Sequence, residues 1–227
     1  MPVDKERYQQ IVKEVDTAKA RLVAVSKTKP VEDIKALYDL GQRDFGENYV
    51  QELTEKAEQL PKDIRWHFIG HLQSNKVKYI ASFVYLVQVV DSLKLLQEID
   101  KQALKNNRTI ECLLQVHIAK EETKFGLDEK ELDELISQPG NLKMNNVNIV
   151  GLMGMASFTE KIDAVRDEFR HLKTLFDKHA RLPTLIPVAI GTRLTTLSMG
   201  MSSDYKVAIE EGSTMVRIGS LLFGSRS

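Results

Sequence analysis

The segment RLVAVSKTKP, residues 21–30, places an amine where chemistry is expected. Residues 21–26 are mostly apolar, as in a buried strand, and Lys27 follows at the point where that strand should end. Partial desolvation disfavours the ammonium form of a lysine and leaves a neutral amine that can form an imine with an aldehyde. Lys29 is a competing amine, but we expect it to be solvated in the loop before Pro30. The alternative interpretation of Lys27 is a solvent-exposed charge at a strand end.

The segment EGSTMVRIGSLLFG, residues 211–224, has the features of a local phosphate site. Gly219 and Ser220 stand at the end of a short apolar run, and the turn residues 212–214 can also aim backbone N–H groups or hydroxyls at an anion. Such a site needs no cluster of basic residues. The alternative is that these glycines only permit tight turns.

Arg217 lies between Val216 and Ile218, so strand alternation directs its side chain to the opposite face, toward the interior of the fold. A buried arginine needs a partner. Two kinds of partner remain open: a carboxylate such as Glu47, or the ring nitrogen of a bound heterocycle.

The elements that must position these residues follow a regular order. Short apolar, β-branched runs alternate with longer charged segments of helical period, as in βα units around a parallel sheet. The expected strands are residues 21–26, 44–48, 66–70, 85–90, 110–118, 148–155, 195–199 and 215–219. Eight strands predict a (β/α)8 TIM barrel, an α/β fold that places its sites at the carboxyl ends of the strands. An open, doubly wound sheet is the alternative, since the sequence does not show whether the first and last strands pair.

The segments between the strands support the barrel. Residues 30–41, 91–107 and 158–180 carry apolar residues at helical spacing. Ser157 or Thr159 is the expected N-cap of the last of these helices. No repeat or linker divides the chain, so we expect residues 1–227 to form one domain.

The composition excludes several classes of partner. Lys plus Arg and Asp plus Glu both total 32, so no overall field favours nucleic acid or an anionic membrane. The single cysteine, Cys112, excludes an internal disulfide and is expected in the core. No segment has the pattern of a signal peptide or a membrane span. We therefore expect a cytoplasmic protein.

Other motifs receive ordinary interpretations. His67 and His71 flank Gly70 in a strand and turn, so their imidazoles do not share a helical face and no metal site is expected. Residues 120–124 are expected to form a loop after the fifth strand. Four methionines are expected to fill the barrel, two of them near its mouth, where they can pack beside a bound ring: Met153, Met155, Met199 and Met201.

Six motifs in this order resemble the pyridoxal phosphate (PLP) homeostasis protein family, relatives of the N-terminal barrel of alanine racemase. They are AVSKTKP, FGENYVQE, WHFIGHLQSNK, GLMGM, LSMGMSSDY and GSTMVRIGSLLFG. The resemblance covers nearly the whole chain. It implies a fold-type III barrel that carries pyridoxal 5′-phosphate as an internal aldimine.

By the same resemblance, the coenzyme-binding residues can be assigned by motif. Lys27 is the aldimine lysine and Arg217 faces the pyridine nitrogen. The phosphate is held by a serine of LSMGMS together with two residues after the last strand. That serine is either Ser202, on the loop side of the seventh strand, or Ser198. The complete set implied is Lys27, Asn48, His71, Ser198, Ser202, Arg217, Gly219 and Ser220, with Asn48 and His71 lining the pocket.

One stretch departs from the family pattern. Residues 182–196 are longer and more apolar than the family pattern, which leaves the start of the seventh strand open. The flanking motifs are intact, so the site assignment stands.

The expected activity is that of a carrier. Arginine stays protonated and cannot give its proton to the pyridine nitrogen, so the coenzyme is a poor electron sink. After Ser227 we expect no second domain to supply an opposing base or to cover the pocket. The sequence thus predicts a monomeric, non-catalytic protein that buffers PLP and delivers it to apo-enzymes. The alternatives are a weak PLP-dependent amino-acid racemase of the alanine type, and a barrel that binds another phosphorylated metabolite without an imine.

Overall fold

The computed structural model describes residues 3–119, 125–137, 144–180 and 194–224. These residues form a closed barrel in which eight parallel strands follow one another in chain order. The expected loop at 120–124, and most of the open stretch at 182–196, lie outside the described residues. The strands are β1 (Arg21–Val25), β2 (Asp44–Glu47), β3 (Arg65–Phe68), β4 (Leu86–Val90), β5 (Ile110–Val116), β6 (Val147–Gly154), β7 (Thr196–Ser198) and β8 (Met215–Ile218).

The pairing of the first and last strands decides between the two predicted architectures. β1 pairs in parallel with β8 from Arg21 opposite Met215 to Ala24 opposite Ile218, which closes the sheet. The (β/α)8 barrel is therefore confirmed, and the open, doubly wound sheet is wrong. All eight strands lie within or close to their predicted ranges, since most residues of each are buried on the barrel wall.

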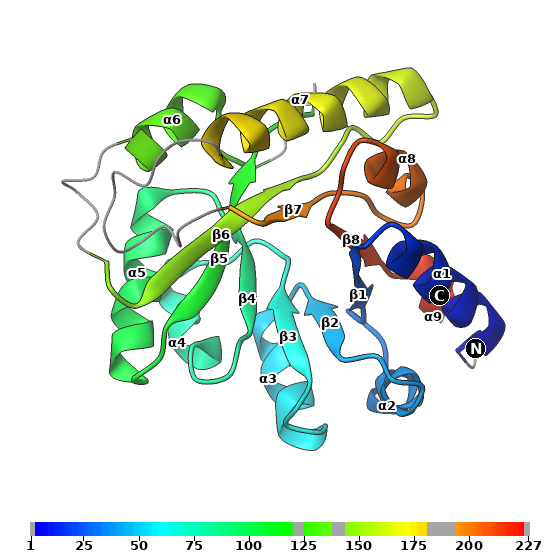
Figure 1. The fold of residues 1–227 in the computed structure, drawn as a ribbon. Helices are drawn as coiled ribbons and strands as arrows, with labels where there is room; N and C mark the ends of the chain where they lie inside the picture. The colour runs from blue at the N-terminus through cyan, green and yellow to red at the C-terminus, as the bar shows by residue number, and fades with distance from the viewer. Residues whose placement is uncertain (1–2, 120–124, 138–143, 181–193, 225–227) are drawn as a thin grey trace.

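Helices surround the barrel on its outer side (Figure 1). They are α1 (Lys5–Thr17), α2 (Val31–Asp39), α3 (Val50–Gln59), α4 (Val77–Ile80) after the 3₁₀ helix η1 (Ser74–Lys76), α5 (Leu93–Lys105), α6 (Glu129–Ser137), α7 (Ile162–Ala180), α8 (Tyr205–Glu210) and α9 (Ser220–Phe223). Within the described ranges, none is both long and apolar enough to span a bilayer.

The start of α7 differs from the prediction. The hydroxyl and the backbone N–H of Ser157 both donate to the carboxylate of Glu168, within α7, at 2.7 and 2.6 Å. Neither Ser157 nor Thr159 is the residue before the first helical position, since α7 begins at Ile162. The predicted N-cap is thus wrong: Ser157 instead ties the end of β6 to the second turn of α7.

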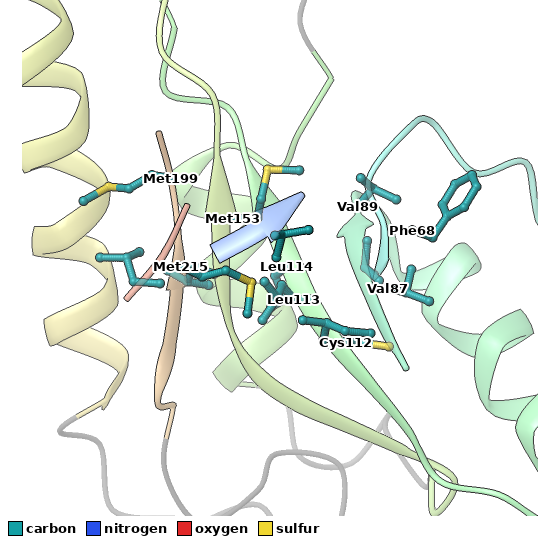
Figure 2. Close-up of a cluster of buried hydrophobic side chains, with 14 of the residues drawn as sticks. Phe68, Val87, Val89, Cys112, Leu113, Leu114, Met153, Met199 and Met215 are labelled. Carbon is teal, nitrogen blue, oxygen red and sulfur yellow. The ribbon is translucent and has the colours of Figure 1, made fainter. Parts of the chain in front are cut away.

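The wall and interior of the barrel hold an apolar cluster that Figure 2 shows around β4, β5 and β6. Cys112 is fully buried there, and burial raises the pKa of its thiol well above its usual range. Met153 and Met199 are also fully buried. The core interpretation of these three residues is confirmed, because each is a flexible or small side chain enclosed by apolar neighbours.

The barrel interior also holds buried polar side chains. The Nε2 atom of His67 lies 2.9 Å from Oδ1 of Asp44, and its Nδ1 atom lies 2.9 Å from Nε2 of Gln88. Arg65 makes a bidentate ion pair with the same carboxylate at 2.9 and 2.6 Å. Burial lowers the pKa of His67, and Arg21 and Arg65 add to that shift, although Asp44 opposes it. His67 is therefore neutral at physiological pH.

This neutral histidine predicts a pH dependence of stability. Below about pH 6.5 an unfolded histidine binds a proton, while His67 in the folded protein does not. The unfolded state then binds more protons, so the free energy of unfolding should fall by up to about 1.4 kcal/mol per pH unit. Urea denaturation between about pH 7.5 and pH 5.5 measures this for the wild type and for His67→Gln. As the pH is lowered, the free energy of unfolding should fall less in His67→Gln than in the wild type. An equal fall in the two proteins would contradict a neutral His67 in the folded state.

Candidate functional site

The carboxyl ends of the strands surround a pocket of about 420 Å³. This is the face on which barrels of this type place their sites, and the volume is within the usual range of small-molecule pockets. The described residues that line it are Val25, Lys27, Lys29, Asn48, Ile69, Met155, Phe158, Met201, Ser202, Ser203, Arg217, Gly219, Ser220 and Gly224. Six of the eight predicted site residues are therefore brought together, from loops that follow β1, β2, β7 and β8 and from β8 itself.

Lys27 lies two residues beyond β1 and is half-buried at the pocket wall. The next residue, Thr28, has a φ of 62°, a left-handed conformation that is strained for a β-branched residue. The backbone N–H of Thr28 donates to the carboxylate of Glu52 at 2.6 Å, which holds this turn in place. The position of Lys27 is thus set by a strained turn that α3 stabilises.

A buried ion-pair network supports the same turn from behind. The Nζ atom of Lys56, in α3, donates to the Ser26 carbonyl at 2.7 Å, to Glu47 Oε1 at 2.8 Å and to Glu52 Oε1 at 2.6 Å. The hydroxyl of Ser26 also donates to Glu47 Oε1, at 2.6 Å. Burial raises the pKa of Glu47, and Lys56 offsets part of that shift. The residues on both sides of Lys27 are therefore tied to a single buried cation.

Lys56 and Glu52 were not predicted as parts of the site. Lys56 is only 5% exposed and occupies the apolar stripe of α3, three residues after the buried Leu53. A lysine on an apolar helical stripe, four residues after a glutamate, is the signal that the sequence offered.

Arg217 points into the barrel, as strand alternation predicted. Its side chain is 4% exposed, and its guanidinium donates to Ser198 Oγ at 2.6 Å and to the Gly154 carbonyl at 3.0 Å. Burial lowers the pKa of Arg217 to about 10, against the opposing charge of Asp204. The guanidinium therefore remains protonated at neutral pH.

The prediction that Arg217 pairs with Glu47 is wrong. Glu47 is not hydrogen-bonded to Arg217, because its carboxylate is committed to Lys56 and Ser26 on the other side of β1. The acceptors that Arg217 contacts are both uncharged.

The structure separates the two serines proposed for the phosphate. Ser202 lines the pocket, and its Oγ accepts a hydrogen bond from the Gly219 backbone N–H at 3.2 Å. Ser198 is fully buried inside the barrel, where it donates to Gln88 Oε1 at 2.7 Å and accepts from Arg217. Ser198 therefore supports Arg217 from below and does not line the pocket.

The turn residues 212–214 lie at the opposite end of the barrel, before β8. The hydroxyl of Ser213 bonds to the carbonyls of Met199 and Met215 at 2.8 and 2.9 Å, and Thr214 N–H donates to the Leu197 carbonyl at 3.0 Å. Their expected role as part of the anion site is wrong, because these groups join β7 to β8.

Asn48 and His71 occupy the side of the mouth next to β2 and β3. Asn48 lines the main pocket and a neighbouring cavity of about 700 Å³, whereas His71 lines only that second cavity. The ring of His71 stacks on Phe125, with 4.7 Å between the centroids. Gly70 allows the two loops to approach, since a Cβ there would lie 2.3 Å from the Asn48 carbonyl oxygen.

The second lysine is less solvated than expected. Lys29 is half-buried, lines the pocket and donates from Nζ to the Phe223 carbonyl at 3.0 Å. The prediction that it is a solvated loop residue is wrong, because α9 folds back over the turn after β1.

Comparisons with known proteins agree with this architecture. The sequence model of the family described as "Alanine racemase, N-terminal domain" matches residues 5–227. A protein of Aquifex aeolicus named pyridoxal phosphate homeostasis protein is 44% identical over 208 residues, covering 91% of this chain and 87% of its own. The Homo sapiens protein of that name is 37% identical over 235 residues, covering 97% of this chain and 83% of its own.

A solved structure is also similar to this chain in fold and sequence. PipY of Synechococcus elongatus PCC7942, with PLP bound, is similar to this chain with a TM-score of 0.84 and 34% identity, covering 96% of this chain and 99% of its own. A barrel of this topology, with this identity over nearly its full length, identifies the chain as a member of the pyridoxal phosphate homeostasis protein family, related to the N-terminal domain of alanine racemase.

Proposed function

We propose that this protein binds pyridoxal 5′-phosphate in the pocket at the mouth of the barrel, holds it reversibly through Lys27, and buffers and delivers it to apo-enzymes. The observation that carries the proposal is the placement of the half-buried amine of Lys27, the buried guanidinium of Arg217 and a serine-lined turn around a single pocket. The names of the relatives and the PLP bound to PipY support the same ligand.

The residues present fit this coenzyme. The side-chain oxygen Oδ1 of Asn48 is buried and lacks a hydrogen-bond partner among the described residues, so it is ready to accept a bond from a ligand. The hydroxyls of Ser202 and Ser220 offer donors to a phosphate. No carboxylate stands among the described lining residues to repel an anion. The coenzyme supplies an electrophilic aldehyde and a conjugated pyridine ring that can withdraw electrons.

Each residue then has a separate task. Lys27 would hold the coenzyme through Nζ, because an amine condenses reversibly with an aldehyde, with loss of water, and hydrolysis reverses the bond. Arg217 would donate to the ring nitrogen and keep its own proton. Ser202, Gly219 and Ser220 bind the phosphate, and Met155 and Met201 line the same pocket.

The same groups favour carriage over catalysis. A ring nitrogen that faces a protonated arginine withdraws electrons weakly, so a carbanion at the substrate α-carbon gains little stabilisation. Racemisation also needs a base on each face of that carbon. The described lining residues include no imidazole, phenol or carboxylate that can serve as the second base.

The direct test is reduction of the loaded protein. Purified protein incubated with PLP should gain visible absorbance, and borohydride should convert the bound coenzyme into a stable adduct on the peptide that contains Lys27. Peptide mass mapping identifies the residue. A protein that stays colourless would count against PLP binding. Binding without any adduct would favour the alternative of a phosphorylated metabolite held without an imine.

One observation favours a weak racemase as the second candidate: Lys29 is another amine at the same pocket. Exchange of the α-hydrogen of alanine for deuterium, followed by NMR, separates the two functions. The carrier should show no exchange above the rate of free PLP, whereas exchange that requires both lysines would establish the racemase.

Three further parts of the proposal concern the whole molecule. We propose that residues 1–227 act as a single domain, that the protein works as a monomer and that it resides in the cytoplasm. The closed barrel supports the first part, and the one buried cysteine suits a reducing compartment. Sedimentation measures the oligomeric state.

A further inference from the structure

A continuous chain of hydrogen-bonded side chains crosses the barrel interior and ends at Arg217. It begins at Asp44 in β2 and passes through His67 in β3, Gln88 in β4 and Ser198 in β7 to Arg217 in β8. The successive distances between hydrogen-bonding atoms are 2.9, 2.9, 2.7 and 2.6 Å. All five side chains are buried, with between 0% and 5% of their residues' surfaces exposed.

The two ends of this chain fix the direction of every hydrogen bond. A guanidinium can only donate, so Ser198 Oγ accepts from Arg217 and its own hydrogen goes to Gln88 Oε1. The Gln88 amide nitrogen then donates to Nδ1 of His67. The proton of the neutral imidazole is therefore on Nε2, which donates to the Asp44 carboxylate.

Burying these five polar side chains costs free energy of desolvation, which their hydrogen bonds must offset. Polar groups in a barrel core lose their hydration, and the interiors of these barrels are normally filled by branched apolar side chains. Apolar residues at the same positions would fill the space without needing partners for each donor and acceptor. The donors and acceptors here all point one way, from a cation at the mouth to an anion at the base of the barrel.

The buried positive charge of Arg217 is stabilised by this hydrogen-bonded chain. Its two hydrogen-bond acceptors within the described residues, Ser198 Oγ and the Gly154 carbonyl, carry no charge. A buried guanidinium without a hydrogen-bonded carboxylate depends on oriented dipoles and on more distant anions. Aligned bonds through Gln88 and His67 present the negative end of each dipole toward the arginine.

We propose that His67, Gln88 and Asp44 are positioning residues for Arg217, holding its guanidinium in the one orientation that serves the ring nitrogen of the bound coenzyme. This inference rests on the proposed function of the pocket. None of the three is among the residues that line the pocket, and their hydrogen bonds reach Arg217 through Ser198.

A substitution that interrupts the hydrogen-bonded side chains at Gln88 tests the proposal. Gln88→Leu replaces the side chain with an apolar one of similar size and removes its hydrogen bonds to His67 and Ser198, together with the one to Met215 Sδ. The variant should bind PLP about tenfold more weakly, since a bond that supports a charged group is lost. The visible absorption band of the bound coenzyme should also move, because the ring nitrogen loses its fixed donor. Gln115→Leu is the matched control: it removes a buried strand glutamine that donates to the Phe125 carbonyl, outside this chain.

A double-mutant cycle distinguishes positioning from general destabilisation. Asp44→Asn removes the negative charge at the end of the hydrogen-bonded chain opposite Arg217. We expect it to weaken PLP binding in the wild type but to cause no further loss of affinity in Gln88→Leu, in which the hydrogen bonds are already interrupted. Additive effects, or an unchanged band and affinity in Gln88→Leu, would overturn the proposal. Circular dichroism of each apo-protein checks folding, and Ser198→Ala cuts the chain independently where Asp44→Asn does not fold. If wild-type protein binds no PLP at all, the proposed function itself fails.

Discussion

Replacing Lys27 with alanine should reduce the borohydride-stable PLP label to background and remove the visible absorbance of the loaded protein. The reason is chemical, since alanine offers no nitrogen to bond to the aldehyde. The proposed phosphate-binding residues Ser202, Gly219 and Ser220 remain, so residual binding should be reversible and lost on gel filtration. Absorbance spectra before and after gel filtration, with mass mapping of the reduced protein, measure both effects.

Two control variants test whether the label is specific to Lys27. Lys35→Ala removes an exposed lysine of α2 that pairs with Asp39, and it should leave labelling unchanged. Lys29→Ala removes the second amine at the pocket, and the label should remain on Lys27. Label that persists in Lys27→Ala and disappears in Lys29→Ala would transfer the covalent role to Lys29.

Replacing Lys56 with methionine should lower the free energy of unfolding by about 3–5 kcal/mol, because it leaves a buried charge uncompensated. The side chain of Glu47 is fully buried, and that of Lys56 is 6% exposed. Methionine replaces the apolar stem of the lysine, ends one atom short of Nζ and cannot donate to Glu47, Glu52 or the Ser26 carbonyl. Urea denaturation followed by circular dichroism gives the change. The loss should be smaller at about pH 5 than at about pH 8, since protonation neutralises Glu47.

The pair can also be removed as a whole. Lys56→Met combined with Glu47→Gln takes out both charges, and this double variant should regain much of the lost stability. Lys35→Met is the surface control and should change stability by no more than about 0.5 kcal/mol. A full loss in the double variant would show that packing rather than charge determines the effect.

Prediction from the sequence succeeded where local pattern and chain order were sufficient. The eight apolar runs predicted the strands, and their alternation with helical segments predicted the barrel. Because parallel strands all end on one face, the sequence predicts that Lys27, Asn48 and Ser202 lie near one another, and all three line the pocket. The alternation of Val216, Arg217 and Ile218 likewise predicted that the arginine points inward.

The predictions that failed concern segments whose role depends on the direction of the neighbouring helix or strand. Ser157 was expected to cap a helix, but it donates to Glu168 within the helix. The turn at 212–214 was expected near an anion, but it lies before β8, at the opposite end of the barrel. Both segments have the local composition of the predicted role, and only the direction of the neighbouring elements excludes that role.

The amino-acid sequence by itself determined the order of strands and helices and the face of the barrel on which the chemistry lies, because periodicity and chain order can be read along the chain. Its six motifs indicated the family, and the pairing of β1 with β8 decided that the sheet closes. Only the tertiary structure decided the rest: that Ser202 and not Ser198 lines the pocket, and that Lys56 supports the turn of Lys27. It also showed that a hydrogen-bonded chain joins Asp44 to Arg217. The physical reason is that closing the barrel brings together side chains from strands that are distant in sequence, and their donors and acceptors can be matched only after that closure.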